Sequence, residues 1–374
     1  MKKHFDYPLF FLVCFLMVFG LVFLACLSSY SSLQKYGNTS YYLTHQFVLA
    51  VLAIAFGLVA YKIPLPFLKR WAPLLVFLSL AGLFLVFIPG IGTKIYGASR
   101  WITIAGHSFQ PSEILKITSI LYLAAWVSSR LSEMGGADKK RGTVKNYHNF
   151  FHILFPFLVF LGTITVGLYL QKDATTLGII TITLFVIYFS AKTPFWHMLV
   201  ILLLGLLALF ILVKFTPYRA DRLSTFLNPD ADPLGSSYQV KQSLISLGSG
   251  GFIGKGLGLG NQKFGRLPMA MNDAVFSVVG EELGFIGTAG IVILFCLFFW
   301  FGVRIAQRST DKFSKLTAIG ITFWITLQAF INMASAIGIF PFVGIPLPFL
   351  SYGGSHLLIE MVGIGILLNI SKNG

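Results

Sequence analysis

Charged residues are scarce in this chain, and their scarcity excludes most classes of soluble protein. Only 11% of the 374 residues are charged, 56% are hydrophobic, and the mean hydropathy is +0.81. Soluble domains carry about 25% charged residues, so this chain could not cover a surface exposed to water. Apolar runs near the ~20-residue length of a membrane-spanning helix recur along it. We therefore expect an all-α polytopic membrane protein, because a backbone in lipid must satisfy its own hydrogen bonds.

Two further absences limit the chemistry. The cysteines Cys14, Cys26 and Cys296 all fall in apolar segments, so no disulfide framework is implied. The glycine-rich stretch 248–260 lacks the Lys-Ser/Thr of a nucleotide-binding loop, so we expect no ATP site. This stretch instead fits a turn-rich or re-entrant segment, whose amides could still face an anion. The sequence also shows no compact cluster of metal ligands.

Ten apolar runs predict about ten transmembrane helices. They cover approximately residues 8–28, 46–61, 72–88, 112–129, 151–170, 175–191, 197–215, 274–300, 316–338 and 355–370. The first run follows Lys2 and Lys3 but is long for a signal peptide and lacks a clear cleavage site, so we expect it to be the first span. An even number of spans places both termini on the same side of the membrane.

Acidic residues are few, and the excess of basic residues gives a net charge of +15. The basic residues lie at span ends rather than along one soluble face, which argues against nucleic acid as a partner. With the termini inside, the inner connections hold Lys2, Lys3, Lys62, Lys69, Arg70, Arg130, Lys139, Lys140, Arg141, Lys145, Lys192, Arg304, Arg308, Lys312, Lys315 and Lys372. The short outer connections hold only Lys35, Lys94, Arg100 and Lys172. This bias predicts cytoplasmic termini.

A long polar segment, about residues 216–273, separates the seventh and eighth spans. Loops of about this length are translocated to the outer side of the membrane largely regardless of their charge. The basic residues of this segment therefore do not alter the predicted orientation. The segment is therefore expected to be extracytoplasmic. Long polar loops commonly carry function, so we expect the chemistry here. No internal repeat is visible, and a single membrane domain over 1–374 is the expected organisation.

Ionisable residues at membrane depth are costly, so each is a candidate for a functional site. Glu113 and Lys116 are three residues apart on one helix face, where they can bind substrate or simply pair with each other. Asp173 lies in a tight outer turn, and capping of the next helix is the simpler explanation for it. Arg100 precedes Trp101 and is either a ligand or part of an interfacial anchor.

Asp273 lies where the long polar segment passes into the eighth span. It is either the N-cap of that helix or a general base at the edge of an apolar helix. At 3.6 residues per turn, Glu281 could share a site with Asp273, whereas Glu282 points to nearly the opposite side.

Several motifs resemble those of the SEDS (shape, elongation, division, sporulation) family of the RodA/FtsW type, in order and over almost the whole chain. The motifs are Arg100-Trp101, Phe109-Gln110-Pro111-Ser112-Glu113-x-x-Lys116, Tyr218-Arg219-x-Asp221-Arg222, Asp232-Pro233, Asn272-Asp273, Glu281-Glu282-Leu283-Gly284 and Pro346-Leu347-Pro348-Phe349-x-Ser351-Tyr352-Gly353-Gly354-Ser355. Two motifs depart from the family pattern. The family usually has Gln-Pro-Asp-Leu-Gly-Thr where this chain has residues 171–176, although Asp173 is retained, and Asn272 replaces the commoner Thr before Asp273.

The resemblance implies a peptidoglycan glycosyltransferase of the bacterial cytoplasmic membrane. Such enzymes polymerise lipid II into glycan strands with a class B penicillin-binding transpeptidase and the division or elongation machinery; residues 96–101 and 122–126 are closer to the division type. It implies that Asp273 is catalytic. Substrate binding would fall to Arg100, Glu113, Lys116, Asp173, Arg219, Arg222, Lys263, Arg266, Ser351 and Ser355. The basic groups would hold the pyrophosphate of the donor, and a divalent cation (Mg or Mn) could assist them.

Two other functions fit many spans and a polar interior. A lipid II flippase would use the intramembrane charges to line a transport path. A scaffold that only recruits the transpeptidase would tolerate the loss of every one of these charges. Substitution of Asp273 by Asn distinguishes a general base from both, unless transport is coupled to protons.

Overall fold

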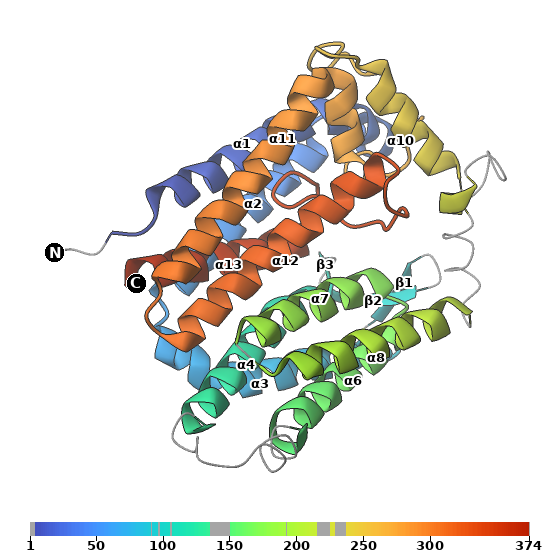
Figure 1. Cartoon of the computed structure of the whole chain (residues 1–374). Helices are drawn as coiled ribbons and strands as arrows, with labels where there is room; N and C mark the ends of the chain where they lie inside the picture. The colour runs from blue at the N-terminus through green and yellow to red at the C-terminus, as the bar shows by residue number, and fades with distance from the viewer. Residues whose placement is uncertain are drawn as a thin grey trace.

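The computed structural model describes residues 4–90, 92–95, 98–104, 107–134, 150–191, 193–214, 225–228 and 237–373, and most of these are helical (Figure 1). The helices are α1 (Tyr7–Tyr36), α2 (Tyr41–Lys62), α3 (Leu65–Leu85), α4 (Pro111–Met134), η1 (Phe150–Leu154), α6 (Phe155–Leu170), α7 (Ala174–Ser190), α8 (Phe195–Lys214), α10 (Tyr238–Ser249), α11 (Val275–Arg308), α12 (Lys312–Ala336) and α13 (Gly354–Asn373).

The all-α membrane architecture is confirmed. Within the described residues, seven helical segments are long and apolar enough to cross a membrane: α1, α2, α3, η1 with α6, α11, α12 and α13. Helices α4, α7 and α8 lie where the other three spans were expected. Helix α4 carries Glu113, Lys116 and Arg130, which lower its hydropathy, and α7 has only 17 residues.

Local sequence signals explain where several helices begin and end. Asp6 is the N-cap of α1, and its Oδ1 accepts a hydrogen bond from the Leu9 amide at 3.0 Å. Asp311 caps α12 in the same way through Ser314. Helix α1 ends at Gly37, whose φ of 69° is a left-handed conformation that glycine adopts without strain.

Two elements of the structure were not predicted. A three-stranded antiparallel sheet connects α3 to α4, with strands β1 (Gly92–Ile95), β2 (Ala98–Ile104) and β3 (His107–Phe109) in the order β1-β2-β3. Ile102 of β2 lies opposite both Gly92 and Phe109. Helix α10 lies within the long polar segment and packs against α11 (Figure 1). Both elements precede helices that carry candidate site residues.

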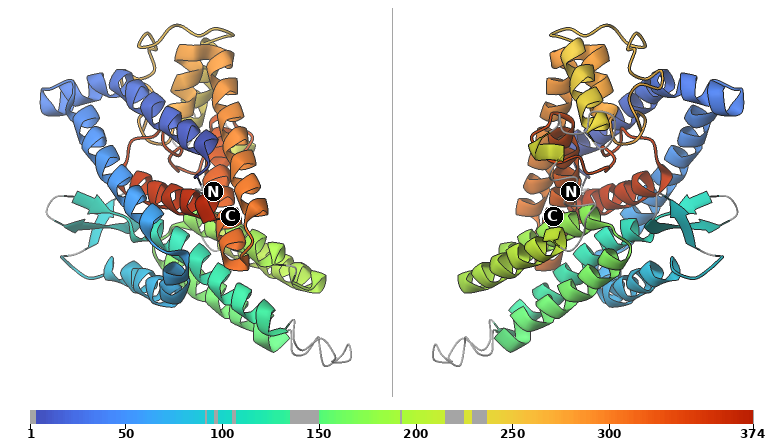
Figure 2. Two further views of the ribbon diagram at one scale, coloured as in Figure 1. Left: turned by 90° about the vertical axis from the view of Figure 1, so that its left-hand side faces the viewer. Right: turned by 90° about the vertical axis from the view of Figure 1, so that its right-hand side faces the viewer.

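Helices α12 and α13 form the centre of the bundle and are its most buried apolar segments. Helix α13 packs along α2, and α12 contacts α4, α7 and α11. The approach of α13 to α2 is close because both are glycine at the crossing: a Cβ built on Gly365 would lie 2.1 Å from the Gly57 carbonyl oxygen. Figure 2 shows α1 and α2 diverging from the turn that joins them, with both chain termini near the ends of α1 and α13.

Candidate functional site

One face of α12 connects the two polar regions of the molecule. Trp324, Gln328 and Asn332 are four residues apart and so lie above one another on this face. Gln328 contacts a buried ammonium on α4, and Asn332 contacts the chain that carries Asp273. The helix therefore holds the charged interior and the candidate catalytic segment in one rigid frame.

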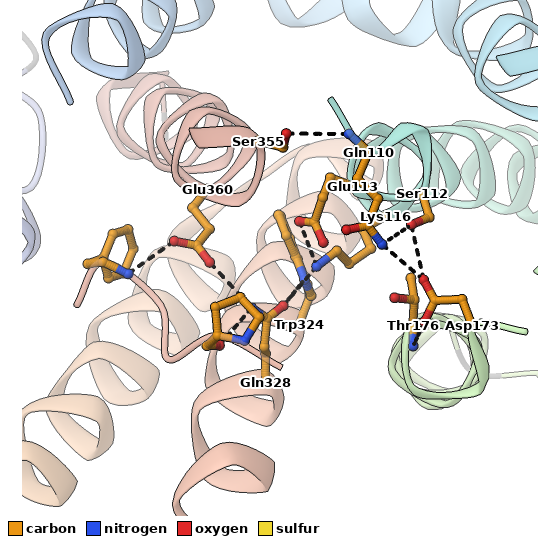
Figure 3. A network of polar contacts seen from close by, with 12 residues as sticks. Gln110, Ser112, Glu113, Lys116, Asp173, Thr176, Trp324, Gln328, Ser355 and Glu360 are labelled. Carbon is orange, nitrogen blue, oxygen red and sulfur yellow. Dashed lines mark hydrogen bonds and ion pairs between the residues drawn. The ribbon is translucent and has the colours of Figure 1, made fainter. Parts of the chain in front are cut away.

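Lys116 is the centre of the charged interior (Figure 3). Its Nζ lies 2.8 Å from Glu113 Oε2 and donates a hydrogen bond to Gln328 Oε1 at 2.9 Å. The side chains of Lys116 and Glu113 are 3% and 7% exposed, so the pair is almost fully removed from solvent. The ammonium also lies 5.3 Å from the centre of the Trp324 ring, a cation–π contact. The expected pairing of Glu113 with Lys116 is thus present.

A second buried carboxylate, Glu360 of α13, joins this network. Gln328 Nε2 donates to Glu360 Oε1 at 3.4 Å and to the Pro346 carbonyl at 3.2 Å. The Phe349 amide donates to Glu360 Oε2 at 3.1 Å. Glu360 therefore ties α12 and α13 to the segment between them. Figure 3 shows that Glu360 and Lys116 both contact Gln328.

Asp173 caps a helix and also bridges to α4. Its Oδ1 accepts from the Thr176 amide at 3.2 Å, which makes Asp173 the N-cap of α7. Its Oδ2 accepts from Gln110 Nε2 at 3.1 Å and from Ser112 Oγ at 3.2 Å (Figure 3). The capping explanation from the sequence is confirmed. The additional contacts place this carboxylate beside the start of α4.

Arg100 extends from β2 to the turn between α6 and α7. Its Nε donates to the Gln171 carbonyl at 3.2 Å, and its Nη2 donates to the Lys172 carbonyl at 2.5 Å. Lys172 has a φ of 58°, so this turn places a non-glycine residue in the left-handed region. The sheet therefore supports the turn that presents Asp173.

The main chain around Asp273 is held at three successive carbonyl groups. Tyr352 N donates to the Met271 carbonyl at 2.8 Å, and Ser351 Oγ donates to the Asn272 carbonyl. Asn332 Nδ2 donates to the Asp273 carbonyl at 2.9 Å, and to the Ile345 carbonyl at 2.7 Å. Residues from α12 and from the segment before α13 thus fix the position of the candidate base.

The Asp273 side chain is partly exposed, whereas Glu113, Asp173, Glu281, Glu282 and Glu360 are all buried. A Cβ built on Gly344 would lie 3.2 Å from Asp273 Oδ2, so the carboxylate faces this glycine. The N-cap of α11 is Ala274, which makes no side-chain capping bond, and Asp273 lies one residue before this cap position. An accessible carboxylate on a rigid main chain can approach a substrate hydroxyl.

The segment between α12 and α13 contains the two candidate serines. Besides its bond to the Asn272 carbonyl, Ser351 Oγ accepts from the Leu347 amide at 2.8 Å. Ser355 Oγ accepts from the Gln110 amide at 3.4 Å (Figure 3). Tyr352 lies in the same segment, and its hydroxyl is 2.9 Å from His45 Nδ1. Burial raises the pKa of Tyr352 to about 12, so its phenol stays protonated near neutral pH.

The glycine-rich stretch does bind anions, but they are the protein's own carboxylates. Glu282 accepts from the amides of Gly258 at 2.8 Å and Gly260 at 3.3 Å. Glu281 accepts from the amides of Asn261 at 2.9 Å and Gln262 at 3.2 Å. Glu281 therefore faces this stretch and is bound there, rather than sharing a site with Asp273.

Two lysines complete these contacts. Lys255 Nζ lies 2.7 Å from Glu281 Oε1, and Lys263 Nζ lies 2.9 Å from Glu282 Oε1 and 2.6 Å from the Gly258 carbonyl. The Lys263 side chain is 4% exposed, so this candidate for substrate binding is held in a buried ion pair. We call residues 254–263 together with Glu281 and Glu282 the carboxylate-bound loop.

The remaining basic candidates differ in position. Arg266 is exposed, and its carbonyl accepts from the Tyr238 hydroxyl at 3.0 Å. Arg219 and Arg222 lie outside the described residues. In the part of the chain that the structure describes, no group of three or more His, Cys, Asp or Glu side chains is arranged to hold a metal ion.

Sequence reasoning missed two of the residues that connect these groups, because Gln328 and Asn332 were not among the candidates, whereas Glu360 counted as one of the ionisable residues at membrane depth. Their signal was available, because amide side chains four residues apart within an apolar span are as unusual as charges there. Amides carry no charge, however, and the candidates at membrane depth were chosen among ionisable residues, so the two amides were not included.

The fold and its polar interior define a polytopic helical membrane protein with a charged network beneath an accessible aspartate. A family model described as "Cell cycle protein" (FtsW, RodA and SpoVE) matches residues 7–374. The chain belongs to this family, which confirms the SEDS resemblance.

Curated relatives and solved structures agree with this assignment. A probable peptidoglycan glycosyltransferase FtsW of Trichlorobacter lovleyi is 40% identical, over 98% of this chain and 93% of that protein. Stage V sporulation protein E of Bacillus subtilis is 34% identical, over 96% and 94%. A chain from a structure titled "Structural coordination of polymerization and crosslinking by a peptidoglycan synthase complex" has a TM-score of 0.77 at 25% identity, over 99% and 98%. Thermus thermophilus RodA has the same fold, with a TM-score of 0.69 at 24% identity, over 99% and 97%.

Proposed function

We propose that this chain is a peptidoglycan glycosyltransferase that polymerises lipid II, with Asp273 as its general base. Relatives at 34–40% identity over nearly the full length are named as probable peptidoglycan glycosyltransferases, which supports the activity. The observation that carries the assignment of Asp273 is its partly exposed carboxylate on a main chain held by Tyr352, Ser351 and Asn332.

The reaction that this geometry supports is a single inverting displacement. The 4-hydroxyl of the acceptor sugar transfers its proton to the Asp273 carboxylate as its oxygen attacks the anomeric carbon of the donor. The bond from that carbon to the polyprenyl pyrophosphate breaks, and the pyrophosphate leaves with the bonding electrons. A base placed within hydrogen-bond reach of the hydroxyl contributes about 10²–10⁴-fold to such a rate.

The leaving pyrophosphate needs cationic groups near the outer surface of the membrane. Arg266 meets this requirement best among the described candidates, because its side chain is exposed and it lies shortly before Asp273 in the chain. Arg219 and Arg222 remain candidates from the sequence. Lys116 is buried beneath the site and paired with Glu113, so its charge acts through the network rather than at the surface.

Location and partners follow as parts of the same proposal. The charge bias of the connections supports cytoplasmic termini and a long extracytoplasmic loop. The chain is proposed to work in the bacterial inner membrane with a class B penicillin-binding transpeptidase, since a solved structure with this fold belongs to a peptidoglycan synthase complex. Because several similar relatives are named FtsW, division is the favoured process.

The decisive test is polymerisation of purified lipid II by the detergent-purified protein with its transpeptidase partner. Wild type should give a ladder of glycan strands, and Asp273→Asn should give none while retaining its melting temperature. Asp6→Asn makes the same carboxylate-to-amide change at the N-cap of α1 and should give wild-type ladders. Equal ladders from Asp273→Asn would remove it from the mechanism. Absence of ladders from the wild type would favour a flippase or a scaffold.

A further inference from the structure

An apolar groove of about 450 Å³ runs between α1, α2 and α13. Its floor lies where α2 and α13 approach at Gly57 and Gly365, so no side chain fills it there. Its walls include Val18 and Leu58, which are 61% and 55% exposed. The divergence of α1 from α2 in Figure 2 opens this side of the bundle. In a membrane, such a groove faces lipid chains.

A cavity of about 560 Å³, lined by polar and apolar residues, lies at the end of the bundle where the chain begins and ends. It is bordered by the connections between α2 and α3 and between α11 and α12, and by the end of α13. Its lining includes Lys62 and Lys372, both exposed, and neither has a carboxylate partner among the described residues. Asp311 also lines the cavity, but it accepts hydrogen bonds from the amide and hydroxyl of Ser314, both at 3.0 Å.

The groove and the cavity meet at Tyr61, which lines both of them. Lys372 Nζ lies 5.5 Å from the centre of the Tyr61 ring. Tyrosine is enriched at the level of lipid headgroups because its ring is apolar and its hydroxyl is polar. The two spaces therefore form one amphipathic site, with an apolar part along the helices and a basic part at their ends.

We propose that this site binds an anionic phospholipid, with the headgroup beside Lys62 and Lys372 and an acyl chain in the groove along α2. The apolar groove alone would accept any lipid chain. The two lysines select for negative charge, since basic residues at the membrane surface attract anionic lipids. With the proposed orientation, the lipid comes from the cytoplasmic leaflet. The site lies at the opposite end of α13 from the Ser355 contact and contains no residue of the proposed active site.

Native mass spectrometry of the full-length, delipidated protein can test this proposal. The protein is titrated with dioleoyl phosphatidylglycerol and, separately, with dioleoyl phosphatidylcholine. Each lysine near a membrane surface strengthens anionic lipid binding by about fivefold. The wild type should therefore prefer phosphatidylglycerol, and Lys62→Gln with Lys372→Gln should abolish that preference. Lys312→Gln with Lys315→Gln removes the same charge from the start of α12, outside the cavity, and should keep it.

The groove has its own matched pair of variants. Leu58→Trp fills the groove and should weaken the binding of both lipids, whereas Leu52→Trp lies on the same helix outside the lining and should not. All these positions are exposed, so the variants should keep the melting temperature of the wild type. Equal binding of the two lipids by the wild type would overturn the proposal. The proposal would also fail if both double lysine variants lost the preference for phosphatidylglycerol equally. It would fail as well if Leu58→Trp bound the two lipids with the affinity of the wild type.

Discussion

The side-chain amide of Asn332 holds the main chain of Asp273 in place. Its Nδ2 donates to the Asp273 carbonyl at 2.9 Å and to the Ile345 carbonyl at 2.7 Å, so one side chain of α12 connects the two segments that border the proposed site. One turn earlier, Gln328 contacts Lys116. The position of the proposed base is thus linked through α12 to the charged interior of the bundle.

Asn332→Asp should test this connection, because it keeps the size of the side chain but removes both hydrogen bonds to the carbonyl groups. We expect the free energy of unfolding to fall by about 1–3 kcal/mol and polymerisation to fall more than tenfold. Thermal unfolding in detergent and the rate of glycan synthesis check both effects. Ser79→Ala removes a buried hydrogen bond to Thr118 between α3 and α4, so it should lower stability without comparable loss of activity. If Ser79→Ala loses as much polymerisation activity as Asn332→Asp for the same loss of stability, Asn332 does not act by positioning Asp273.

Lys116→Met should leave the Glu113 carboxylate buried without its cation. Removing one partner of a buried pair costs about 3–5 kcal/mol, so we expect a large drop in melting temperature. Adding Glu113→Gln to the same variant removes the uncompensated charge and should restore part of the loss. If the double variant is no more stable than Lys116→Met alone, the pair does not account for the stability of this region.

Lys263 and Arg266 should separate in their effects although they are close in the sequence. Lys263→Met breaks the buried contact with Glu282 and should lower the melting temperature and expose residues 254–263 to protease. Arg266→Gln alters an exposed side chain, so it should leave stability unchanged and raise the KM for lipid II. The melting temperature and the KM for lipid II are measured for both variants. A raised KM with unchanged stability in Lys263→Met, and lowered stability in Arg266→Gln, would exchange the roles of the two residues.

Gly344→Ala should impair catalysis through contact with the proposed base. Gly344 has a φ of 62°, and an added Cβ would lie 3.2 Å from Asp273 Oδ2. Gly338→Ala provides the control. Gly338 also has a left-handed φ, of 76°, but a Cβ added there would meet only the side chain of Leu244, at 3.5 Å. Both variants should lose about 1 kcal/mol of stability from backbone strain. Only Gly344→Ala should lose polymerisation by tenfold or more; equal rates would show that this glycine does not affect Asp273.

The sequence predicted the helical membrane architecture because a bilayer requires long apolar runs, and seven helical segments within the described residues are long and apolar enough to cross it. It did not predict the sheet, whose strand β3 has only three residues and whose alternation over residues 98–104 is too short to stand out. Helix α10 was missed because its polar face resembles the loop around it.

The candidate site was predicted in its charged members but not in its connections. Glu113, Lys116 and Asp173 could be paired or capped on the basis of spacing, because their partners are near in the sequence. The contacts of Asn332 with Asp273 and of Gln328 with Lys116 join residues far apart in the chain. Only packing of α12 against α4 and α11 brings them together.

The glycine beside Asp273 also bears on drug resistance. An inhibitor that occupied the space next to Gly344 could not be displaced simply by a larger residue at that position. Any side chain there would strain a left-handed backbone and crowd the carboxylate on which the proposed reaction depends. Resistance to such a compound would therefore have to arise elsewhere, at positions whose substitution leaves Asp273 accessible.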